Sequence, residues 1–170
     1  LQLLIAALAV MAVVTLIFVH ILANVAVEYD IKMNLERELY KCHKEISINA
    51  AGQILSSDDF FQRDGEIVIL VIDASGKVLA GEYPKGYPKD IELGVKKLQQ
   101  ASVGKETYYI RDIRKYIDNG PQIYVRGVVR RSDTYSRYQM MEYLAAVSIL
   151  IVSGVAILGG VLLSKRISGS

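Results

Sequence analysis

Two uninterrupted apolar stretches lie near opposite ends of this 170-residue chain, at residues 1–27 and 143–163. Each is long enough to cross a hydrocarbon core of about 30 Å as an α-helix, which rises about 1.5 Å per residue. The first stretch exceeds the apolar core of a signal peptide, usually about 7–15 residues, and no A-x-A-like cleavage site precedes Glu28. We therefore predict transmembrane helices at residues 1–27 and 140–163; a signal peptide or a buried core helix is the alternative for the first.

The residues that follow the second stretch indicate its orientation. Lys165 and Arg166 come directly after Ser164, and positive charges just beyond a span favour the cytoplasmic side of the membrane. We therefore expect residues 28–139 to form an extracytoplasmic domain and residues 164–170 to begin a cytoplasmic linker. Because the chain does not begin with Met and stops shortly after the second stretch, we expect it to be a fragment of a larger protein.

The composition argues against two classes of site. The net charge is only +2, and no basic cluster is interleaved with aromatic residues, so we expect no nucleic-acid partner. Cys42 is the only cysteine, which excludes an intramolecular disulfide and a multi-cysteine metal site. We also expect no cofactor.

Helical periodicity continues beyond the first apolar stretch. From Glu28 to about Asp59 the chain has no proline, and apolar residues recur at steps of three and four, which is typical of one face of an α-helix. These residues are Ile31, Leu35, Leu39, Cys42, Ile46, Ala50 and Ile54. We predict a long helix over residues 28–59 that continues directly from the first span and makes the domain and the span one rigid unit.

The pattern then changes to that of strands. Residues 66–73 (EIVILVID) are apolar and rich in β-branched side chains, which predicts a buried central strand. The DASG turn that ends this run predicts a hairpin with a second strand at residues 77–83. Residues 105–117 and 122–131 are also strand-like, and the tripeptide DNG between them is a strong hairpin signal.

Between the two hairpins, Asp90 is placed to cap a short helix over about residues 90–102. In the last strand, Val125 shares a face with Gly127. The order of elements predicts an α+β domain with an antiparallel sheet and a short helix over residues 66–131. A domain of this length can bury its own core.

The chain resembles the input half of a bacterial sensor histidine kinase with a PAS-like extracytoplasmic domain of the PDC or single-Cache type. The likeness rests on the long helix after the first span, on the hairpin sequence IVILVIDASGKVLAG, and on YVRGVV shortly before the second span. The sequence SKRIS at residues 164–168 also resembles the junction with a HAMP domain or a kinase-linker helix, although Gly169 stands where many such junctions have proline. The resemblance implies a PAS-like sheet and a location in the bacterial inner membrane.

No catalytic constellation is apparent, and we expect this fragment not to be an enzyme. His20 lies in the first span and His43 on the long helix, whereas the phosphoacceptor histidine of such kinases belongs on a cytoplasmic helix. An ionisable residue within a span is a functional candidate; for His20 the alternative is a side chain that reaches the interface. Asp58 and Asp59 fit a solvated loop better than a cation site.

A small-ligand site is predicted from the resemblance, between the sheet and the loop-and-helix segment that follows the first hairpin. The residues expected to line it are Tyr83, Tyr87, Tyr108, Arg111, Tyr124 and Arg126. An arginine fork there suits a carboxylate. The alternative is a solvated sheet face on which tyrosine and arginine reflect β-propensity alone, and a protein could equally be the external ligand.

Small residues recur at steps of three and four in the second span: Ser153, Ala156, Gly160 and Ser164. Such a stripe lets helices approach closely, so we expect it to pack against the first span or against a dimer mate. Tolerance of glycine in membrane helices is the alternative explanation.

Together these features predict the signal-input module of a homodimeric two-component sensor in contact with membrane lipid. A stimulus outside would shift the packing of a four-helix membrane bundle, and the shift would pass to a cytoplasmic kinase domain and its response regulator. The alternatives are the input module of a chemoreceptor or cyclase, and a membrane-anchored interaction domain without a signalling role.

Overall fold

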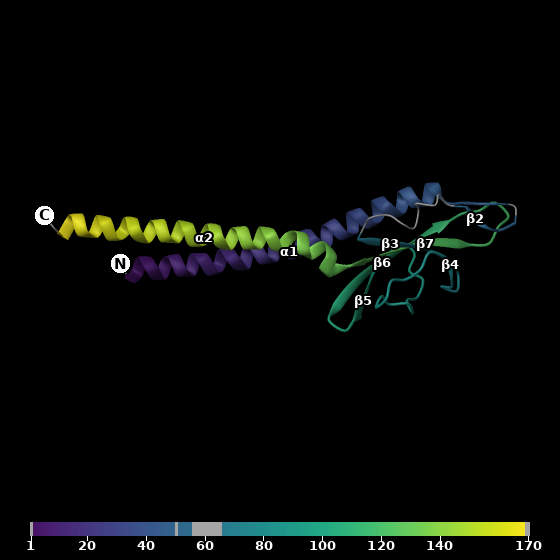
Figure 1. Cartoon of the computed structure of the whole chain (residues 1–170), viewed down its shortest axis with the longest axis horizontal. Helices are drawn as coiled ribbons and strands as arrows, with labels where there is room; N and C mark the ends of the chain where they lie inside the picture. Colours follow the sequence, from purple (N-terminus) through teal and green to yellow (C-terminus); the bar gives the residue numbers. More distant parts are fainter. Residues whose placement is uncertain (1, 50, 56–65, 169–170) are drawn as a thin grey trace. The chain divides into compact units, whose positions relative to one another are not determined.

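A computed structural model of the chain describes residues 2–49, 51–55 and 66–168 (Figure 1). In chain order its helices and strands are α1 (Gln2–Glu45), β1 (Ser47–Ile48), β2 (Ile54–Leu55), β3 (Ile67–Asp73), β4 (Val78–Ala80), β5 (Leu98–Val103), β6 (Glu106–Lys115), β7 (Ile123–Arg130) and α2 (Arg131–Ser168). The chain divides into two compact units. We call Leu1–Ala26 with Tyr135–Ser170 the helix pair, and Val27–Thr134 the sheet unit.

The sheet unit is built on a five-stranded antiparallel sheet with the strand order β4-β3-β7-β6-β5. The predicted central run EIVILVID forms β3, and β7 beside it is buried along almost its whole length. Burial on both faces explains why β3 is a nearly continuous apolar run rather than an alternating one. The predicted α+β class with an antiparallel sheet is confirmed.

The second half of α1 covers one face of this sheet. Leu35 and Leu39 are fully buried there, in a cluster that includes Val71 and Val125. Gly127 permits the close approach, because a Cβ at this position would lie 2.7 Å from Leu35 Cδ1. The predicted apolar face of the helix is therefore correct from Ile31 to Cys42, both of which are buried, and Ile46, just beyond the helix, is buried as well.

The predicted helix over residues 28–59 is too long, because α1 ends at Glu45. Lys115 Nζ donates a hydrogen bond to the carbonyl oxygen of His43, at 2.6 Å, and so satisfies one of the last helical carbonyls. Beyond it, Asn49 Oδ1 accepts the backbone N–H of Gln53, at 2.9 Å, in the turn of the β1–β2 hairpin. Ile54 packs on the core from this hairpin, while Ala50 and residues 56–59 lie outside the described residues.

The predicted short helix over residues 90–102 is also wrong. Leu98–Val103 is strand β5, paired with β6, and Val95 forms an isolated parallel bridge with Asp112. Lys96 has a φ of 68°, in the left-handed region, which ends any right-handed helical path there. The backbone groups of β6 require partners along the sheet, and β5 supplies them at a position where local periodicity favoured a helix.

The helix pair is formed by the first part of α1 and most of α2. The two helices run antiparallel, as two contacts show: Leu4 lies against Gly160, and His20 lies against Glu142. Both α1 and α2 are long and apolar enough to cross a membrane. None of the most apolar 18-residue window of either helix is buried within the structure, whereas the core helix of a soluble protein would be. Apolar surface on this scale requires lipid or another protein to cover it.

Candidate ligand face and helix connections

The segment between β4 and β5, residues 81–97, covers the face of the sheet opposite to α1. Tyr83, Tyr87, Ile91 and Leu93 from this segment pack on a buried cluster contributed by β3, β6 and β7. We call residues 81–97 the cover segment. It contains no α-helix, so it depends on contacts with the sheet for its conformation.

A buried ion pair lies beneath the cover segment. Arg126 on β7 and Asp112 on β6 are direct partners in the strand register, and their side chains are fully buried. Arg126 Nε donates to Asp112 Oδ1 at 2.7 Å, and Nη2 donates to Oδ2 at 2.8 Å. This is the bidentate geometry that binds a carboxylate most strongly.

The remaining donors of Arg126 hold the cover segment. Nη1 donates to the carbonyl oxygen of Ile91 at 3.0 Å and to the hydroxyl of Tyr83 at 3.3 Å, while Nη2 also donates to the carbonyl oxygen of Glu92 at 3.1 Å. Burial opposes the charge of Arg126, but the hydrogen bonds that Arg126 donates to Asp112 and Tyr83, together with the negative charge of Asp112, outweigh it. The pKa of Arg126 is therefore raised above its ordinary value, and the side chain is a permanent cation.

Five of the six residues predicted to line a ligand site lie on this face: Tyr83, Tyr87, Tyr108, Tyr124 and Arg126. Tyr108 donates to the carbonyl oxygen of Gly86 at 3.2 Å, and its ring centroid lies 4.8 Å from that of Tyr87. Tyr124 donates to Gln122 Oε1 at 3.1 Å. These tyrosines pack the cover segment against the sheet.

Arg111 lies on the other face, where its Nη2 is 3.0 Å from Glu36 Oε1 of α1. Arg111 and Arg126 therefore do not form one fork. The carboxylate that Arg126 holds is that of Asp112, which the sequence reasoning missed. A usable signal existed, because Asp112 and Arg126 are equally far in sequence from Asn119 in the predicted hairpin turn. The role of this face in ligand binding stays a prediction.

The first turn of α2 is hydrogen-bonded to the sheet. Ser132 donates to Glu106 Oε2 at 2.8 Å, and the buried Thr134 donates to Glu66 Oε2 at 3.2 Å. Asp133 accepts a hydrogen bond of 2.7 Å from Arg130. The negative charge of Asp133 in the first turn also interacts favourably with the helix dipole and so stabilises the start of α2. This pairing raises the pKa of Arg130. The start of α2 is thus attached to residues adjoining β3 and at the beginning of β6.

Tyr109 links α1 to the start of α2 within the sheet unit. Its hydroxyl donates to Glu28 Oε1 of α1 at 3.4 Å and is hydrogen-bonded by Arg131, the first residue of α2. Burial, together with the negative charge of Glu28, raises the pKa of Tyr109. One side chain of the sheet therefore contacts both helices that continue into apolar segments.

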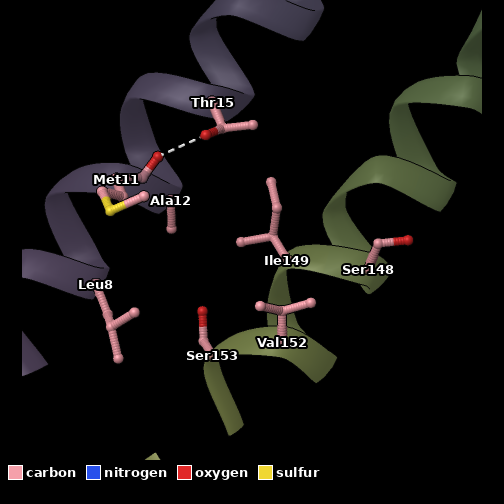
Figure 2. A pocket seen from close by; sticks show the side chains of 8 residues that line it. All are labelled: Leu8, Met11, Ala12, Thr15, Ser148, Ile149, Val152 and Ser153. Carbon is pink, nitrogen blue, oxygen red and sulfur yellow. Dashed lines mark hydrogen bonds between the residues drawn. The ribbon is translucent and has the colours of Figure 1, made fainter. Parts of the chain in front are cut away.

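The helix pair contains the residues predicted to pack in the second span. Ser153 of α2 lines a cavity of about 220 Å³ with Leu8 and Ala12 of α1, and Figure 2 shows these side chains between the two ribbons. A Cβ on Gly160 would lie 3.0 Å from Leu4 Cδ2. Ala156 is half-buried, but Ser164 is exposed. Three of the four predicted residues therefore lie in the part of α2 that is not fully exposed.

The two histidines have different surroundings. Nε2 of His43 lies 3.2 Å from the carbonyl oxygen of Arg114 in the sheet unit, which is a structural contact. His20 contacts Glu142 across the helix pair. Among the residues that the structure describes, no three histidine, cysteine, aspartate or glutamate side chains are grouped to hold a metal ion.

Comparison with known proteins identifies no relative: no family model, no curated protein and no solved structure matches the chain. The function must therefore be argued from the contacts described above.

Proposed function

We propose that this chain is the signal-input module of a homodimeric membrane sensor, with α1 and α2 as its membrane helices and the sheet unit as an extracytoplasmic PAS-like domain. The output would be a cytoplasmic histidine kinase that acts on a response regulator, in the inner membrane of a bacterium. The chain described here would bind and transmit rather than catalyse.

The observation that carries this proposal is that α1 and α2 are both held by the same small sheet. The second half of α1 packs in the core through Leu35 and Leu39, and the first turn of α2 is hydrogen-bonded through Ser132 and Thr134. A simple membrane anchor needs only one such attachment and no buried polar contacts. Two attachments to one sheet mean that a change in the sheet acts on both helices together.

A stimulus can act only if it binds two conformations with different affinity. The cover segment is a suitable element, because it has no helix and is held through the Arg126–Asp112 pair. A carboxylate ligand at Arg126 would have to displace Asp112, so we propose that a ligand acts on the cover segment and its tyrosines without replacing that ion pair.

Topology is the first test. In a Cys42→Ala background, single cysteines at Lys105, in the exposed β5–β6 turn, and at Ile167, near the end of α2, would be labelled with a membrane-impermeant maleimide in intact cells. We expect labelling of the Lys105→Cys chain from outside and of the Ile167→Cys chain only after lysis. Equal labelling of both in intact cells would refute the two-span arrangement.

Signalling is the second test. The chain through residue 168 would be joined to the cytoplasmic half of a two-component kinase, and autophosphorylation would be measured in membranes. We expect Tyr109→Phe and Ser132→Ala to change the basal rate, and Tyr116→Phe, at a position 75% exposed, to leave it unchanged. Correct topology with no effect of any variant would favour a membrane-anchored interaction domain.

A further inference from the structure

The helix pair contains a connected set of polar side chains among apolar neighbours. His20 Nδ1 lies 3.1 Å from Glu142 Oε1, and the hydroxyl of Tyr135 donates to both oxygens of Glu142 at 3.1 Å. Asn24 Nδ2 lies 3.1 Å from His20 Nε2 and donates to the carbonyl oxygen of His20 at 2.8 Å. We call Asn24, His20, Glu142 and Tyr135 the polar clasp.

The contacts of the polar clasp define one arrangement of protons. The amide nitrogen of Asn24 can only donate, so His20 Nε2 accepts and carries no proton. His20 Nδ1 then carries the proton and donates it to the Glu142 carboxylate. The set therefore fits a neutral Nδ1–H imidazole that bridges α1 to α2, and every hydrogen bond has a donor and an acceptor.

The apolar packing near the polar clasp leaves open space between the two helices. A cavity of about 320 Å³ lies in the same helical turns, lined by residues that include Ala23 of α1 and Ala145 of α2. Apolar contacts have little directional preference, and the small side chains of Ala23 and Ala145 leave part of this space unfilled. Hydrogen bonds, in contrast, weaken steeply with distance and angle.

We propose that the polar clasp fixes the axial register of α1 against α2. A displacement of even one residue moves a helix by about 1.5 Å, and a displacement of one turn by about 5.4 Å. A displacement of one turn would separate His20 from Glu142 beyond hydrogen-bonding distance. Ionisable groups that lose their partners in apolar surroundings are costly, so the register seen here is the one in which all clasp residues are paired. This inference goes beyond the proposed function, since it holds whether or not a kinase follows.

Disulfide crosslinking of the full chain in lipid bilayers tests the register. In a Cys42→Ala background, Leu4→Cys with Gly160→Cys reports the observed register, because these positions are in contact. Leu8→Cys with Gly160→Cys reports a register displaced by about one turn. In the chain with an intact clasp, we expect the first pair to crosslink far faster than the second.

Substitutions in the polar clasp should remove that preference. Given the strength of hydrogen bonds between membrane helices, we expect Glu142→Leu or His20→Leu to reduce the ratio of the two crosslinking rates roughly three- to tenfold. Glu142→Gln keeps an acceptor for His20 and Tyr135, so this variant should retain most of the preference for the observed register. Gln139→Leu is the matched control, because Gln139 is an exposed residue of the same helix.

Two results would overturn the proposal. The first is an unchanged ratio in both Glu142→Leu and His20→Leu. The second is a ratio that falls equally in Gln139→Leu, since that would show a general response to added apolar surface. If the Glu142→Leu chain does not insert into the bilayer, the same fall in the crosslinking ratio is expected for Asn24→Leu and His20→Leu. Nitrogen NMR of the histidine rings gives a separate readout, with a neutral Nδ1–H ring expected for His20 and lost in Glu142→Leu.

Discussion

Arg126 and Asp112 face each other directly across β7 and β6, and their fully buried side chains form two hydrogen bonds of 2.7 and 2.8 Å. The same guanidinium donates to backbone carbonyls of the cover segment. A pair of this kind is costly to bury but still more costly to break, because one charge is then left without its partner. Its role in this fold is to hold an irregular segment on the sheet.

We therefore predict that Arg126→Met lowers the free energy of unfolding of the full chain by about 3–5 kcal/mol, because Asp112 is left buried and unpaired. The measurement is denaturant unfolding in detergent micelles, followed by circular dichroism. The double variant Arg126→Met/Asp112→Leu should lose less than Arg126→Met alone, and Lys105→Met, in the exposed turn, should lose almost nothing. A double variant that is less stable than Arg126→Met would contradict this account.

Gly127 provides a second stability test. A Cβ at this position would lie 2.7 Å from Leu35 Cδ1 and 3.1 Å from Leu39 Cδ2. Because both leucines are fully buried, we expect Gly127→Ala to cost about 1–3 kcal/mol through overpacking. Gly154→Ala in α2 is the control, since a Cβ there meets nothing within 4 Å. Equal stability of the two variants in denaturant unfolding would show that α1 packs less closely on β7.

Tyr109 and Tyr87 should make stability depend on alkaline pH. Burial raises the pKa of both hydroxyls, so the folded chain keeps these protons to higher pH than the unfolded chain. Their contribution to stability is complete below the unfolded pKa of about 10 and is lost as the pH rises through the folded pKa.

We expect the free energy of unfolding to fall less steeply between about pH 9 and pH 11 in Tyr87→Phe/Tyr109→Phe than in the unmodified chain. The control is Tyr29→Phe/Tyr40→Phe, because these side chains are 66% and 62% exposed. If the free energy of unfolding falls equally with pH in the unmodified chain and in the Tyr87→Phe/Tyr109→Phe chain, these two hydroxyls do not cause the pH dependence.

Packing in the helix pair gives a further prediction. A Cβ on Gly160 would lie 3.0 Å from Leu4 Cδ2, whereas Ser164 is exposed. We expect Gly160→Leu to push the helices apart and to slow disulfide formation between Ala12→Cys and Ser153→Cys in bilayers, roughly tenfold for a lost small-residue contact. Ser164→Leu should leave the rate unchanged. A larger effect of Ser164→Leu would point to a contact of that residue with another chain.

The sequence by itself determined the elements whose identity follows from a local pattern of apolar residues. The two terminal apolar stretches lie in α1 and α2, the step of three and four identified Leu35 and Leu39 as a buried face, and the β-branched run identified β3. These are periodicities along one segment, and each is produced by burial of one side of that segment. No knowledge of its partner is needed.

Only the tertiary structure decided where α1 ends, that Leu98–Val103 is a strand, and which groups pair with Arg126, Arg111 and His20. Leu98 fits the spacing of a short helix equally well, and its state is settled by hydrogen bonds to β6. Pairing depends on register and topology, which bring residues distant in sequence within about 3 Å of one another. Periodicity in a single segment carries no information about that second segment. The hairpin centred on Asn119 places Asp112 opposite Arg126 in the sequence, but the partners of Arg111 and His20 became visible only in the folded chain.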